Sequence, residues 1–600
     1  MVPDTPLDEY VMTTDQNPSN WPQHAALSRP SGEADQPRDF DWVAKNIPCQ
    51  AACPAGTDIP GYLDAVAHGN FDKAYRINLR DNVFPAVLGR VCTRPCEPAC
   101  RHGWEGLGEP VAICWAKRAG ADWQERGQPV ALKPLFRPSG KKVAVVGAGP
   151  AGLAVARELA LWGHEVVVLE REEKPGGLMV LGIPPFRLPR EIVEREIEQV
   201  RLTGVDIRCG VEVGQDVELD ELRGEYDVVI VASGALKPRV PDVTGSSLAG
   251  IRHGLDFLHE ANTKGVASVS ERVMVVGGGF TAVDCARTAL RLGAGEVTVC
   301  YRRSEEEMYI TPGEVEEMER EGIAFKTMVA PKEYLGEQGR VAGVRFVQTE
   351  LGDPDETGRR RPQEVAGSDF TEPCGCVLLA TGQVRDTEWI AGDVDDRQGE
   401  GGTSVENLFV TGDFAGGSDS LIDAIAHAKT CARSVDRHLV GTDRFRDVVV
   451  IEDASSTGRT RDMDEIPRQT MPIREIDQRA LRDEVETGYD QGASSTEASR
   501  CYLCHYKFEI DNDLCIYCDR CLKVMPVEHC IVKVKGLTYG EDGCIIGHTP
   551  SKGSRDYNLL YINQNECIRC GACAEVCPVE CISLQKVSKC TLVSSKEQER

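Results

Sequence analysis

The sequence has no uninterrupted apolar run long enough to span a bilayer, which argues against an integral membrane protein. Its opening stretch, MVPDTPLDEYVMTTDQNPSN, is polar and acidic and lacks the hydrophobic core of a signal peptide. An excess of basic residues is also absent, since the formal net charge is −27 at pH 7. This charge disfavours nucleic acid as a partner, although solubility alone would also explain it. We expect a cytoplasmic protein that binds neither membranes nor nucleic acids.

Cysteine, by contrast, is unusually abundant. The chain of 600 residues carries 25 cysteines, and they cluster near its two ends. In a reducing compartment such clusters indicate metal ligation more than disulfide bonds. A chain of this length exceeds what one hydrophobic core supports, so we expect about three to five domains.

Hydrophobic periodicity divides the chain further. From Lys141 to about Gly441, apolar β runs alternate with helical patterns, which is typical of α/β architecture. The flanking regions lack this alternation. The expected segments are a polar N-terminal arm (1–40), a helical cysteine-bearing domain (41–135), a dinucleotide-binding domain (141–265 and 375–441), a second one inserted into it (266–374), a wrapping linker (442–504), a second cysteine-rich domain (505–590) and a tail (591–600).

The first glycine-rich motif follows an apolar strand at 143–146 and precedes a helical pattern. It reads Gly147-Ala-Gly149-Pro150-Ala151-Gly152. The glycines permit a tight turn and let backbone N–H groups approach a pyrophosphate at the helix N-terminus. A second strand ends at Glu170, where a carboxylate binds a ribose hydroxyl pair. Together these features predict a dinucleotide site; a glycine-rich turn without a ligand is the alternative.

The second glycine-rich motif reads Gly277-Gly-Gly279-Phe-Thr-Ala282, with alanine in place of the third glycine. Its second strand ends in Arg302 and Arg303, and no acid stands in the usual place. Two guanidinium groups at that point suit the 2′-phosphate of NADPH, which we prefer to NADH. A solvated loop in which the arginines pair with Glu305–Glu307 is the alternative.

Two dinucleotide motifs in one chain suggest a flavoprotein that binds both FAD and a nicotinamide nucleotide. An Asp after a β run can bond the flavin ribityl chain, and the helix that follows can point its N-terminus at the flavin. The additional candidate residues lie after the first motif, at a strand-to-turn crossing and in the segment TGD: Gly176, Gly177, Leu178, Thr381, Gly382, Gly412 and Asp413.

Three segments carry a family resemblance. GIPPFRLPREIVEREIE (182–198), YRRSEEEM after the second motif, and the TGD segment resemble the small subunit of NADPH-dependent glutamate synthase. The same region, residues 41 to about 440, is similar to the N-terminal half of dihydropyrimidine dehydrogenase. The resemblance implies FAD in the first domain, NAD(P)H in the inserted second domain, and a helical N-terminal domain with two 4Fe–4S clusters. The expected fold is therefore two Rossmann-like domains with a helical iron–sulfur domain before them and an α+β bacterial-ferredoxin-like domain after them.

The C-terminal cysteines match the bacterial ferredoxin pattern. The run Cys567-x2-Cys570-x2-Cys573-x3-Cys577-Pro has the ferredoxin spacing, in which the fourth cysteine ligates the other cluster. Its partner run has Met525 in the fourth position, and Cys530 follows. We predict one cluster on Cys515, Cys518, Cys521 and Cys577, and a second on Cys567, Cys570, Cys573 and Cys530. A 3Fe–4S cluster is the alternative for the second. Separate zinc ribbons match two interlocked runs poorly.

The N-terminal cysteines are too few for two clusters. Two 4Fe–4S clusters take eight ligands, and this region supplies six thiols: Cys49, Cys53, Cys92, Cys96, Cys100 and Cys114. The family carries an additional C-x2-C before the position of Cys49, but no cysteine lies between Asp39 and Ile47 here.

A matching segment stands near the other end of the chain. EVETGYDQGASSTEASRCYLC (484–504) resembles the family's N-terminal lead-in, moved behind the flavin domain. By the family pattern, one cluster takes Cys49, Cys100, Cys501 and Cys504, and the other takes Cys53, Cys92 and Cys96. The fourth ligand of the latter is a Gln or Glu in relatives. Lys117 stands there in this chain, so Cys114 is the preferred fourth ligand, with solvent or backbone as the alternative. Buried thiols at a domain join are the alternative for Cys501 and Cys504.

The remaining cysteines lack ligand spacing and are expected to be structural, with Cys581 as a reserve ligand: Cys209, Cys285, Cys300, Cys374, Cys376, Cys431, Cys544, Cys581 and Cys590.

The cofactors would supply the chemistry, so we predict no catalytic side chain. The function we expect is an oxidoreductase subunit that exchanges hydride with NAD(P)H and relays single electrons through four 4Fe–4S clusters to or from a catalytic partner subunit. The alternative is a stand-alone NAD(P)H oxidoreductase that uses ferredoxin or another carrier. A structural scaffold without cofactors fits the intact motifs poorly.

Overall fold

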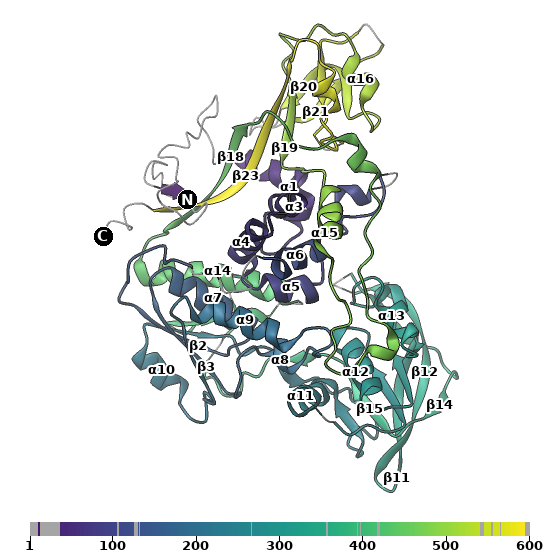
Figure 1. Cartoon of the computed structure of the whole chain (residues 1–600). Helices are drawn as coiled ribbons and strands as arrows, with labels where there is room; N and C mark the ends of the chain where they lie inside the picture. The colour runs from purple at the N-terminus through teal and green to yellow at the C-terminus, as the bar shows by residue number, and fades with distance from the viewer. Residues whose placement is uncertain are drawn as a thin grey trace.

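The computed structural model describes residues 10–12 and 37–594, except 105–106, 125–129, 131, 266, 356–357, 393, 397, 417–419, 540–544, 554–555 and 565. Most of the N-terminal arm and Cys544 therefore lie outside the described residues. Figure 1 shows the helices of the N-terminal module between two sheet-containing modules below and a small C-terminal module above.

The N-terminal module is helical. Asp58 and Asn70 cap two of its helices by accepting hydrogen bonds from Gly61 N and Lys73 N. Gly89 brings two helices into close contact, since a Cβ there would lie 2.6 Å from Arg118 Cα. The helices are α1 (Pro37–Asn46), α2 (Pro48–Ala51), α3 (Ile59–Ala67), α4 (Phe71–Asn82), α5 (Pro85–Val91), η3 (Arg101–Gly103) and α6 (Ile113–Asp122).

The next module is built on a parallel sheet in the order β17-β5-β2-β3-β4. Successive residues of β2 are buried on opposite faces, because helices and loops cover both sides of the sheet. Its elements are β2 (Lys142–Val146), α7 (Pro150–Leu161), β3 (Glu165–Glu170), α8 (Leu178–Leu181), α9 (Arg190–Arg201), β4 (Asp206–Cys209), α10 (Leu219–Glu225), β5 (Val228–Val231), β17 (Leu408–Val410), η5 (Gly412–Phe414) and α14 (Leu421–Val440).

The inserted module repeats this plan with the parallel order β10-β9-β8-β15-β7. Its elements are β7 (Ile251–His253), α11 (Gly254–Lys264), β8 (Arg272–Val276), α12 (Phe280–Arg291), β9 (Glu296–Cys300), η4 (Glu305–Glu307), α13 (Glu314–Arg320), β10 (Ala324–Lys326) and β15 (Cys376–Leu379). An antiparallel sheet with β12 pairing β11, β13 and β14 extends it: β11 (Val329–Glu337), β12 (Arg340–Pro354), β13 (Arg360–Glu364) and β14 (Phe370–Pro373). A two-stranded ribbon, β6 (Lys237–Pro238) with β16 (Gln383–Val384), lies where the chain crosses between the two modules.

The expected boundary between these two modules was misplaced. Strands β7 and β15 were assigned to the first module, but both pair within the second sheet. A short apolar run predicts a buried strand, but it carries no information about which of two parallel sheets the strand joins.

The C-terminal region is more regular than expected. The supposed wrapping linker begins with a strand, β18 (Phe445–Asp453), which pairs along its length with β23 (Ile582–Ser594). β23 also extends into the supposed tail and pairs with β19 (Tyr506–Ile510) and β1 (Tyr10–Met12). The remaining elements are η6 (Arg461–Glu465), η7 (Ile476–Gln478), α15 (Gln491–Ser499), α16 (Arg520–Val524), β20 (Ile531–Tyr539), β21 (Ile545–Pro550), β22 (Leu559–Ile562) and α17 (Ala572–Glu575).

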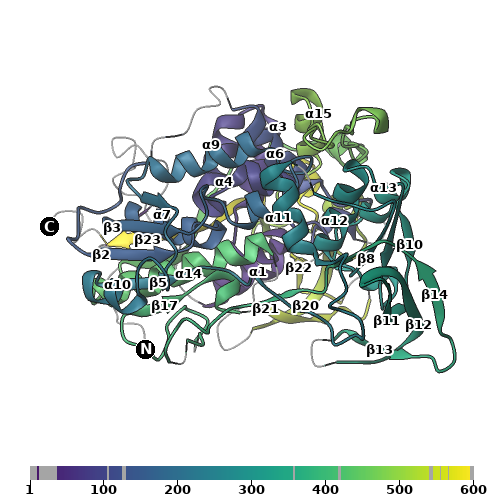
Figure 2. The same ribbon diagram turned by 90° about the horizontal axis from the view of Figure 1, so that it is seen from below.

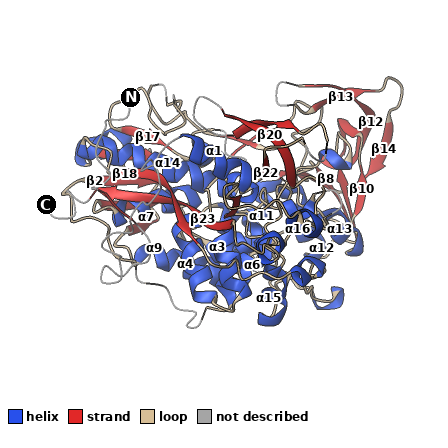
Figure 3. Cartoon of the chain, turned by 90° about the horizontal axis from the view of Figure 1, so that it is seen from above, coloured by secondary structure: helices blue, strands red, loops and turns tan. Residues whose placement is uncertain are grey.

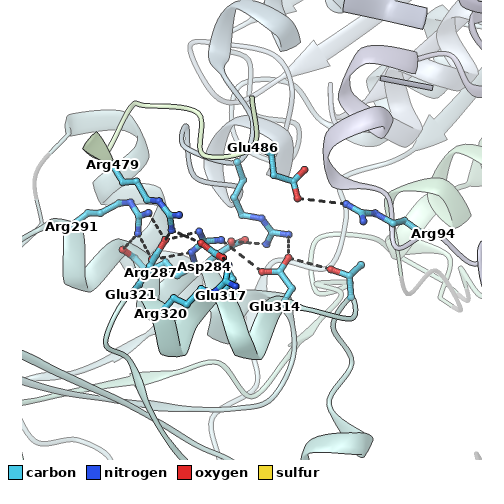
Figure 4. Close-up of polar contacts among 12 residues, drawn as sticks. Arg94, Asp284, Arg287, Arg291, Glu314, Glu317, Arg320, Glu321, Arg479 and Glu486 are labelled. Carbon is cyan, nitrogen blue, oxygen red and sulfur yellow. Dashed lines mark hydrogen bonds and ion pairs between the residues drawn. The ribbon is translucent and has the colours of Figure 1, made fainter. Parts of the chain in front are cut away.

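Segment 454–490 is tied to the inserted module by buried ion pairs (Figure 4). Glu321 accepts from Arg287, Arg291 and Arg479, at 2.7 to 2.8 Å for each. Burial alone would raise the pKa of Glu321, but the hydrogen bonds from Arg291 and Arg287 hold it well below its usual range. The segment is therefore anchored by charge as well as by packing.

Figures 2 and 3 show the first sheet and the antiparallel strands β12–β14 toward opposite ends of the molecule, with helices between them. Within the described residues, none of the helices combines the length and hydrophobicity needed to cross a bilayer.

Candidate cofactor sites

The first glycine-rich turn joins β2 to α7 and requires its glycines. Gly147 has φ 104°, and a Cβ there would lie 2.6 Å from the carbonyl oxygen of Ala232. A Cβ at Gly152 would lie 1.9 Å from the carbonyl oxygen of Gly147. Among the described residues, no side chain caps the N-terminus of α7, so its N–H groups are available to an anion. This geometry fits a bound pyrophosphate.

Glu170 lies beside this turn at the end of β3. Its carboxylate accepts hydrogen bonds from the backbone N–H of Ala148 at 2.7 Å and of Glu172 at 2.9 Å. The acid is thus held next to the position at which a ribose would follow the pyrophosphate.

Two segments distant in sequence converge on the start of α7. A Cβ at Gly177 would lie 2.8 Å from Gly149 Cα, so the Gly176–Gly177 turn packs directly on the first motif. Gly412 has φ 65°, and a Cβ there would lie 2.5 Å from the Ala151 Cβ. Asp413 follows in η5. The structure therefore brings together the residues that the sequence predicted for one flavin nucleotide.

No sequence pattern indicated that a histidine lies beside this site. His427 Nδ1, on α14, accepts a hydrogen bond from the Gly412 N–H at 3.2 Å. Its Nε2 then carries the proton and donates to the Asp396 carboxylate at 2.9 Å. This pair fixes the TGD turn. A conformation-dependent contact of this kind leaves no spacing pattern in the chain.

The second glycine-rich turn has the same construction. Gly277 has φ 152°, and a Cβ there would lie 2.3 Å from the Ala380 carbonyl oxygen. The N-terminus of α12, which follows Gly279, is also free of a side-chain cap. Ala282 is fully buried in place of the third glycine. Thr381 and Gly382 follow β15 at the crossing between modules, where Thr381 Oγ1 donates to the Arg239 carbonyl at 2.6 Å.

The two arginines after β9 have different surroundings. Arg303 is buried, donates to the Arg360 carbonyl at 2.8 Å and pairs with Glu307 at 3.5 Å. Arg302 is exposed, and the positive charges of Arg359 and Arg239 act on it. Arg302 is therefore free to meet an anionic ligand, whereas Arg303 fits the alternative of pairing within the loop.

One cavity brings together cysteines from the two ends of the chain. Cys49, Cys100, Cys501 and Cys504 all line it. Burial raises the pKa of the Cys49 thiol, and the charges of Cys504, Cys100 and Cys501 raise it further. The structure thus brings together the four cysteines that were predicted to share one cluster.

The segment that carries Cys501 is folded into the N-terminal module. Helix α15 packs on α3 and α6. Glu497, which is fully buried, accepts from the Ala112 N–H at 2.7 Å and from Arg500 at 2.7 Å. Cys501 and Cys504 thus follow directly after a helix that packs into the N-terminal module, although this helix lies near the other end of the sequence.

The second N-terminal set gathers around α6. Cys114 donates its thiol proton to the Leu88 carbonyl at 3.1 Å. The neighbouring Cys114 side chain lowers the pKa of the Cys92 thiol, so these two sulfurs are adjacent. Lys117 is buried in the same place and feels the charges of Cys92, Cys114, Cys53 and Cys96.

The C-terminal cysteines form two groups. Burial raises the pKa of the Cys530 thiol to about 12, and Cys567 and Cys570 contribute to the rise, so Cys530 lies beside the second run. The other group lines one cavity and has five members, one more than predicted: Cys515, Cys518, Cys521, Cys577 and Cys581. Cys581, which the sequence left as a reserve ligand, therefore lies with the four cysteines predicted for this cluster.

A strained backbone residue marks each cysteine group. Arg94, Leu503, Tyr517 and Arg569 have φ between 50° and 62°, which residues other than glycine rarely adopt. Each stands two residues after a cysteine. The N–H groups of Arg94, Leu503 and Tyr517 donate to the sulfurs of Cys92, Cys501 and Cys515 at 3.4 to 3.5 Å. N–H···S bonds of this kind stabilise the charge on cluster thiolates.

The groups do not resemble single-ion sites. Across the described ranges, no three His, Cys, Asp or Glu side chains converge on one metal-ion position. A tetrahedral zinc ion holds its thiolates about 2.3 Å from one centre, whereas an iron–sulfur cluster spreads them over several irons. The cysteines present fit iron–sulfur clusters better than zinc.

Family comparisons agree with this arrangement. The family described as pyridine nucleotide-disulphide oxidoreductase matches residues 141–431. Dihydropyrimidine dehydrogenase domain II, 4Fe-4S cluster, matches residues 42–128, and a 4Fe-4S binding domain matches residues 560–583.

Three similar proteins cover most of the chain. The beta subunit of NADP(+)-dependent formate dehydrogenase from Moorella thermoacetica is 37% identical over 509 residues, which are 76% of this chain and 70% of that protein. The beta subunit of NADPH-Fe(3+) oxidoreductase from Geobacter sulfurreducens is 35% identical, with coverages of 76% and 75%. The small chain of NADPH glutamate synthase from Escherichia coli is 35% identical, with coverages of 67% and 91%. These matches confirm the resemblance and the fold class expected from the sequence.

Proposed function

The chain belongs to the family that contains the small chain of NADPH glutamate synthase and the beta subunit of NADP(+)-dependent formate dehydrogenase, and on this premise we propose that it is the FAD- and iron–sulfur-containing NAD(P)H oxidoreductase subunit of a larger enzyme. When bound, FAD would accept hydride from the nicotinamide and pass the electrons singly to iron–sulfur clusters. The protein residues bind and orient these groups.

The nucleotide sites divide between the two sheet modules. FAD would lie on the turn at Gly147–Gly152, with Glu170 on its ribose and the turns at Gly177 and Gly412 around it. The nicotinamide nucleotide would lie on the turn at Gly277–Ala282. Arg302 is the proposed 2′-phosphate ligand, which favours NADPH over NADH.

Four ligand sets are proposed for 4Fe–4S clusters. The N-terminal module would hold one on Cys49, Cys100, Cys501 and Cys504 and one on Cys53, Cys92, Cys96 and Cys114. The C-terminal module would hold one on Cys530, Cys567, Cys570 and Cys573 and one on Cys515, Cys518 and Cys521 with Cys577 or Cys581.

The observation that carries the relay is the contact between the two iron–sulfur modules. Arg101, directly after Cys100, donates to the carbonyl oxygens of Cys567 at 3.0 Å and Gln564 at 2.9 Å. Arg569 donates to Asn46 Oδ1 at 3.2 Å from the other side. The contact supports a single electron path in which the split ligand set lies between the flavin module and the C-terminal clusters.

A catalytic partner would complete the enzyme. The similar proteins are named as beta or small subunits, and no catalytic side chain is needed within this chain for hydride exchange. Either a dedicated catalytic subunit or a diffusible carrier such as ferredoxin could take the electrons, and the size of the native complex separates these two possibilities.

Iron analysis of the anaerobically purified chain tests the proposal. We expect one FAD, reduction of the flavin by NADPH, and about sixteen iron atoms per chain. The double variant Cys501→Ala/Cys504→Ala should lose about four of them, while the matched variant Cys209→Ala should lose none. Unchanged iron in the double variant would refute the split site. Isolation of a stable larger assembly supports the subunit assignment, and an active lone protein supports the carrier.

A further inference from the structure

Lys117 occupies an unusual position in the N-terminal module. It lies on α6, less than one helical turn after Cys114, and only 5% of it is exposed. The residues on either side of it, Ala116 and Arg118, are also buried, so solvent has little access to this part of α6. A lysine in such a place either pairs with an anion or gives up its proton.

The nearby arginines show how this module usually balances a buried cation. Arg90 pairs with Asp122 at 3.0 Å and with Glu484 at 2.7 Å. Arg118, the residue after Lys117, pairs with the same two carboxylates, each at 3.0 Å. Each of these cations therefore has acidic partners within ion-pair distance.

Lys117 has no such partner: within the described part of the chain, no carboxylate forms an ion pair with it. The titratable side chains that act on it are those of Cys92, Cys114, Cys53 and Cys96. A buried ammonium group without a carboxylate partner needs another anion beside it, and a cluster bound by these cysteines would supply that anion.

We propose that Lys117 is the built-in counter-charge of the cluster held by Cys53, Cys92, Cys96 and Cys114, and that it sets the reduction potential of that cluster. The proposal rests on the ligand set given under Proposed function. An unpaired buried charge is strongly destabilising, whereas an anionic cluster bound by four thiolates supplies the missing partner.

The charge has a direct redox consequence. Reduction adds one electron, and thus one negative charge, to a cluster. A fixed ammonium nearby stabilises the reduced state more than the oxidised state, so it raises the potential. Lys117 thereby eases electron entry into an all-thiolate cluster from the adjacent flavin module. Lys117 acts through the cluster, so it is a positioning residue rather than a catalytic one.

The test is a dithionite titration of the full-length, anaerobically purified protein, followed by EPR. In Lys117→Met, one cluster signal should shift to a lower midpoint potential, whereas Lys117→Arg should stay close to the native value. Lys73→Met, an exposed lysine on α4, is the matched control and should change nothing. An unchanged midpoint in Lys117→Met with all iron retained would overturn the proposal.

A second comparison covers variants that lose the cluster. If charge is what matters, iron retention should fall in the order Lys117→Arg, Lys117→Met, Lys117→Glu. Met and Glu are similar in size, so equal retention in these two variants would indicate a packing role and overturn the proposal. Because dithionite is the reductant, none of these results depends on NADPH. Failure of NADPH to reduce the flavin would instead contradict the proposed function.

Discussion

Arg101 donates a hydrogen bond to the carbonyl oxygen of Cys567 at 3.0 Å, and this bond joins the two iron–sulfur modules of the chain. Arg101 is 1% exposed, and its acceptors among the described residues are all neutral: the carbonyl oxygens of Cys567, Gln564 and Lys45, and Asn46 Oδ1. The guanidinium thus lies between the split cysteine set and the second ferredoxin run, where it both fixes the spacing and adds positive charge.

Replacing Arg101 should slow electron transfer between the modules. In Arg101→Met, an increase of about 1.4 kcal/mol in the activation barrier would slow reduction of the C-terminal clusters by NADPH about tenfold. Flavin reduction should keep its native rate, because the nucleotide sites are untouched. Rapid-freeze EPR measures both. Lys552→Met, at an exposed lysine of the C-terminal module away from the cysteine cavities, is the control. Equal slowing of flavin reduction would contradict the assigned position of Arg101 on the path.

Cys577 and Cys581 should substitute for one another. Their sulfurs are 3.5 Å apart in a cavity that also contains Cys515, Cys518 and Cys521, so two thiols compete for one ligand position. We expect each single alanine variant to keep its iron and the double variant to lose about four iron atoms per chain. Iron loss in Cys577→Ala alone would show that Cys581 cannot reach the cluster.

Local patterns predicted the nucleotide-binding folds well. The two glycine-rich motifs were recognised from residues adjacent in sequence, whereas the backbone that excludes a Cβ at Gly147 and Gly277 comes from Ala232 and Ala380, far along the chain. The cysteine sets were predicted from spacing and from the family pattern, and the structure brings their members together. Their role as cluster ligands stays a prediction.

Long-range features were missed for physical reasons. Strand β18 was hidden because its apolar core, Val448–Val450, is short and flanked by charge, and its pairing strand lies more than a hundred residues away. Neither Lys117 nor Arg101 forms an ion pair with a carboxylate among the described residues, although each stands near acidic residues in sequence, so this property depends on their three-dimensional surroundings. The His427–Asp396 contact likewise joins residues with no characteristic spacing.

Nucleotide preference should depend on Arg302 and not on Arg303. Arg302 is exposed, and loss of a charge-assisted bond worth about 1.5–3 kcal/mol should raise the KM for NADPH roughly tenfold to a hundredfold in Arg302→Ala. The KM for NADH should hardly change. Arg303 holds the loop through Arg360 and Glu307, so Arg303→Ala should impair both nucleotides. Steady-state kinetics with both nucleotides decide this, and equal effects of Arg302→Ala on the two would exclude a 2′-phosphate contact.

Removing Arg479 should release segment 454–490 from the inserted module. Arg479 pairs with Glu317 and with Glu321 (2.8 Å for the latter), and its side chain is 6% exposed. Breaking one partner of a buried pair costs about 3 kcal/mol. We expect faster amide exchange at residues 471–490 in Arg479→Ala. The neighbouring Arg482 is exposed, and Arg482→Ala should behave like the native protein. Native exchange in Arg479→Ala would mean that packing alone anchors the segment.

Glu196 should make stability fall as the pH rises. It is 1% exposed, lies on α9 of the flavin module and accepts from the N–H groups of Ala86 and Val87 at the start of α5, at 2.8 and 3.0 Å. Burial raises the pKa of Glu196 from 4.5 to about 7, against the effect of these two hydrogen bonds. Between these values the folded protein binds more protons than the unfolded chain, so the free energy of unfolding decreases with pH.

The expected decrease is measurable against a matched variant. Between about pH 5.5 and 8, the stability of the native protein relative to Glu196→Gln should fall by roughly 2 kcal/mol, because about 1.5 pH units of the window lie below the folded pKa. Above pH 8 the difference should be constant. Glu198→Gln, on an exposed position of the same helix with a side chain 54% accessible, should parallel the native curve. Calorimetric unfolding across this pH range measures the difference. If the stability curves of the native protein and Glu196→Gln run parallel, Glu196 is ionised at every pH tested, which is the state that its two N–H donors alone would favour.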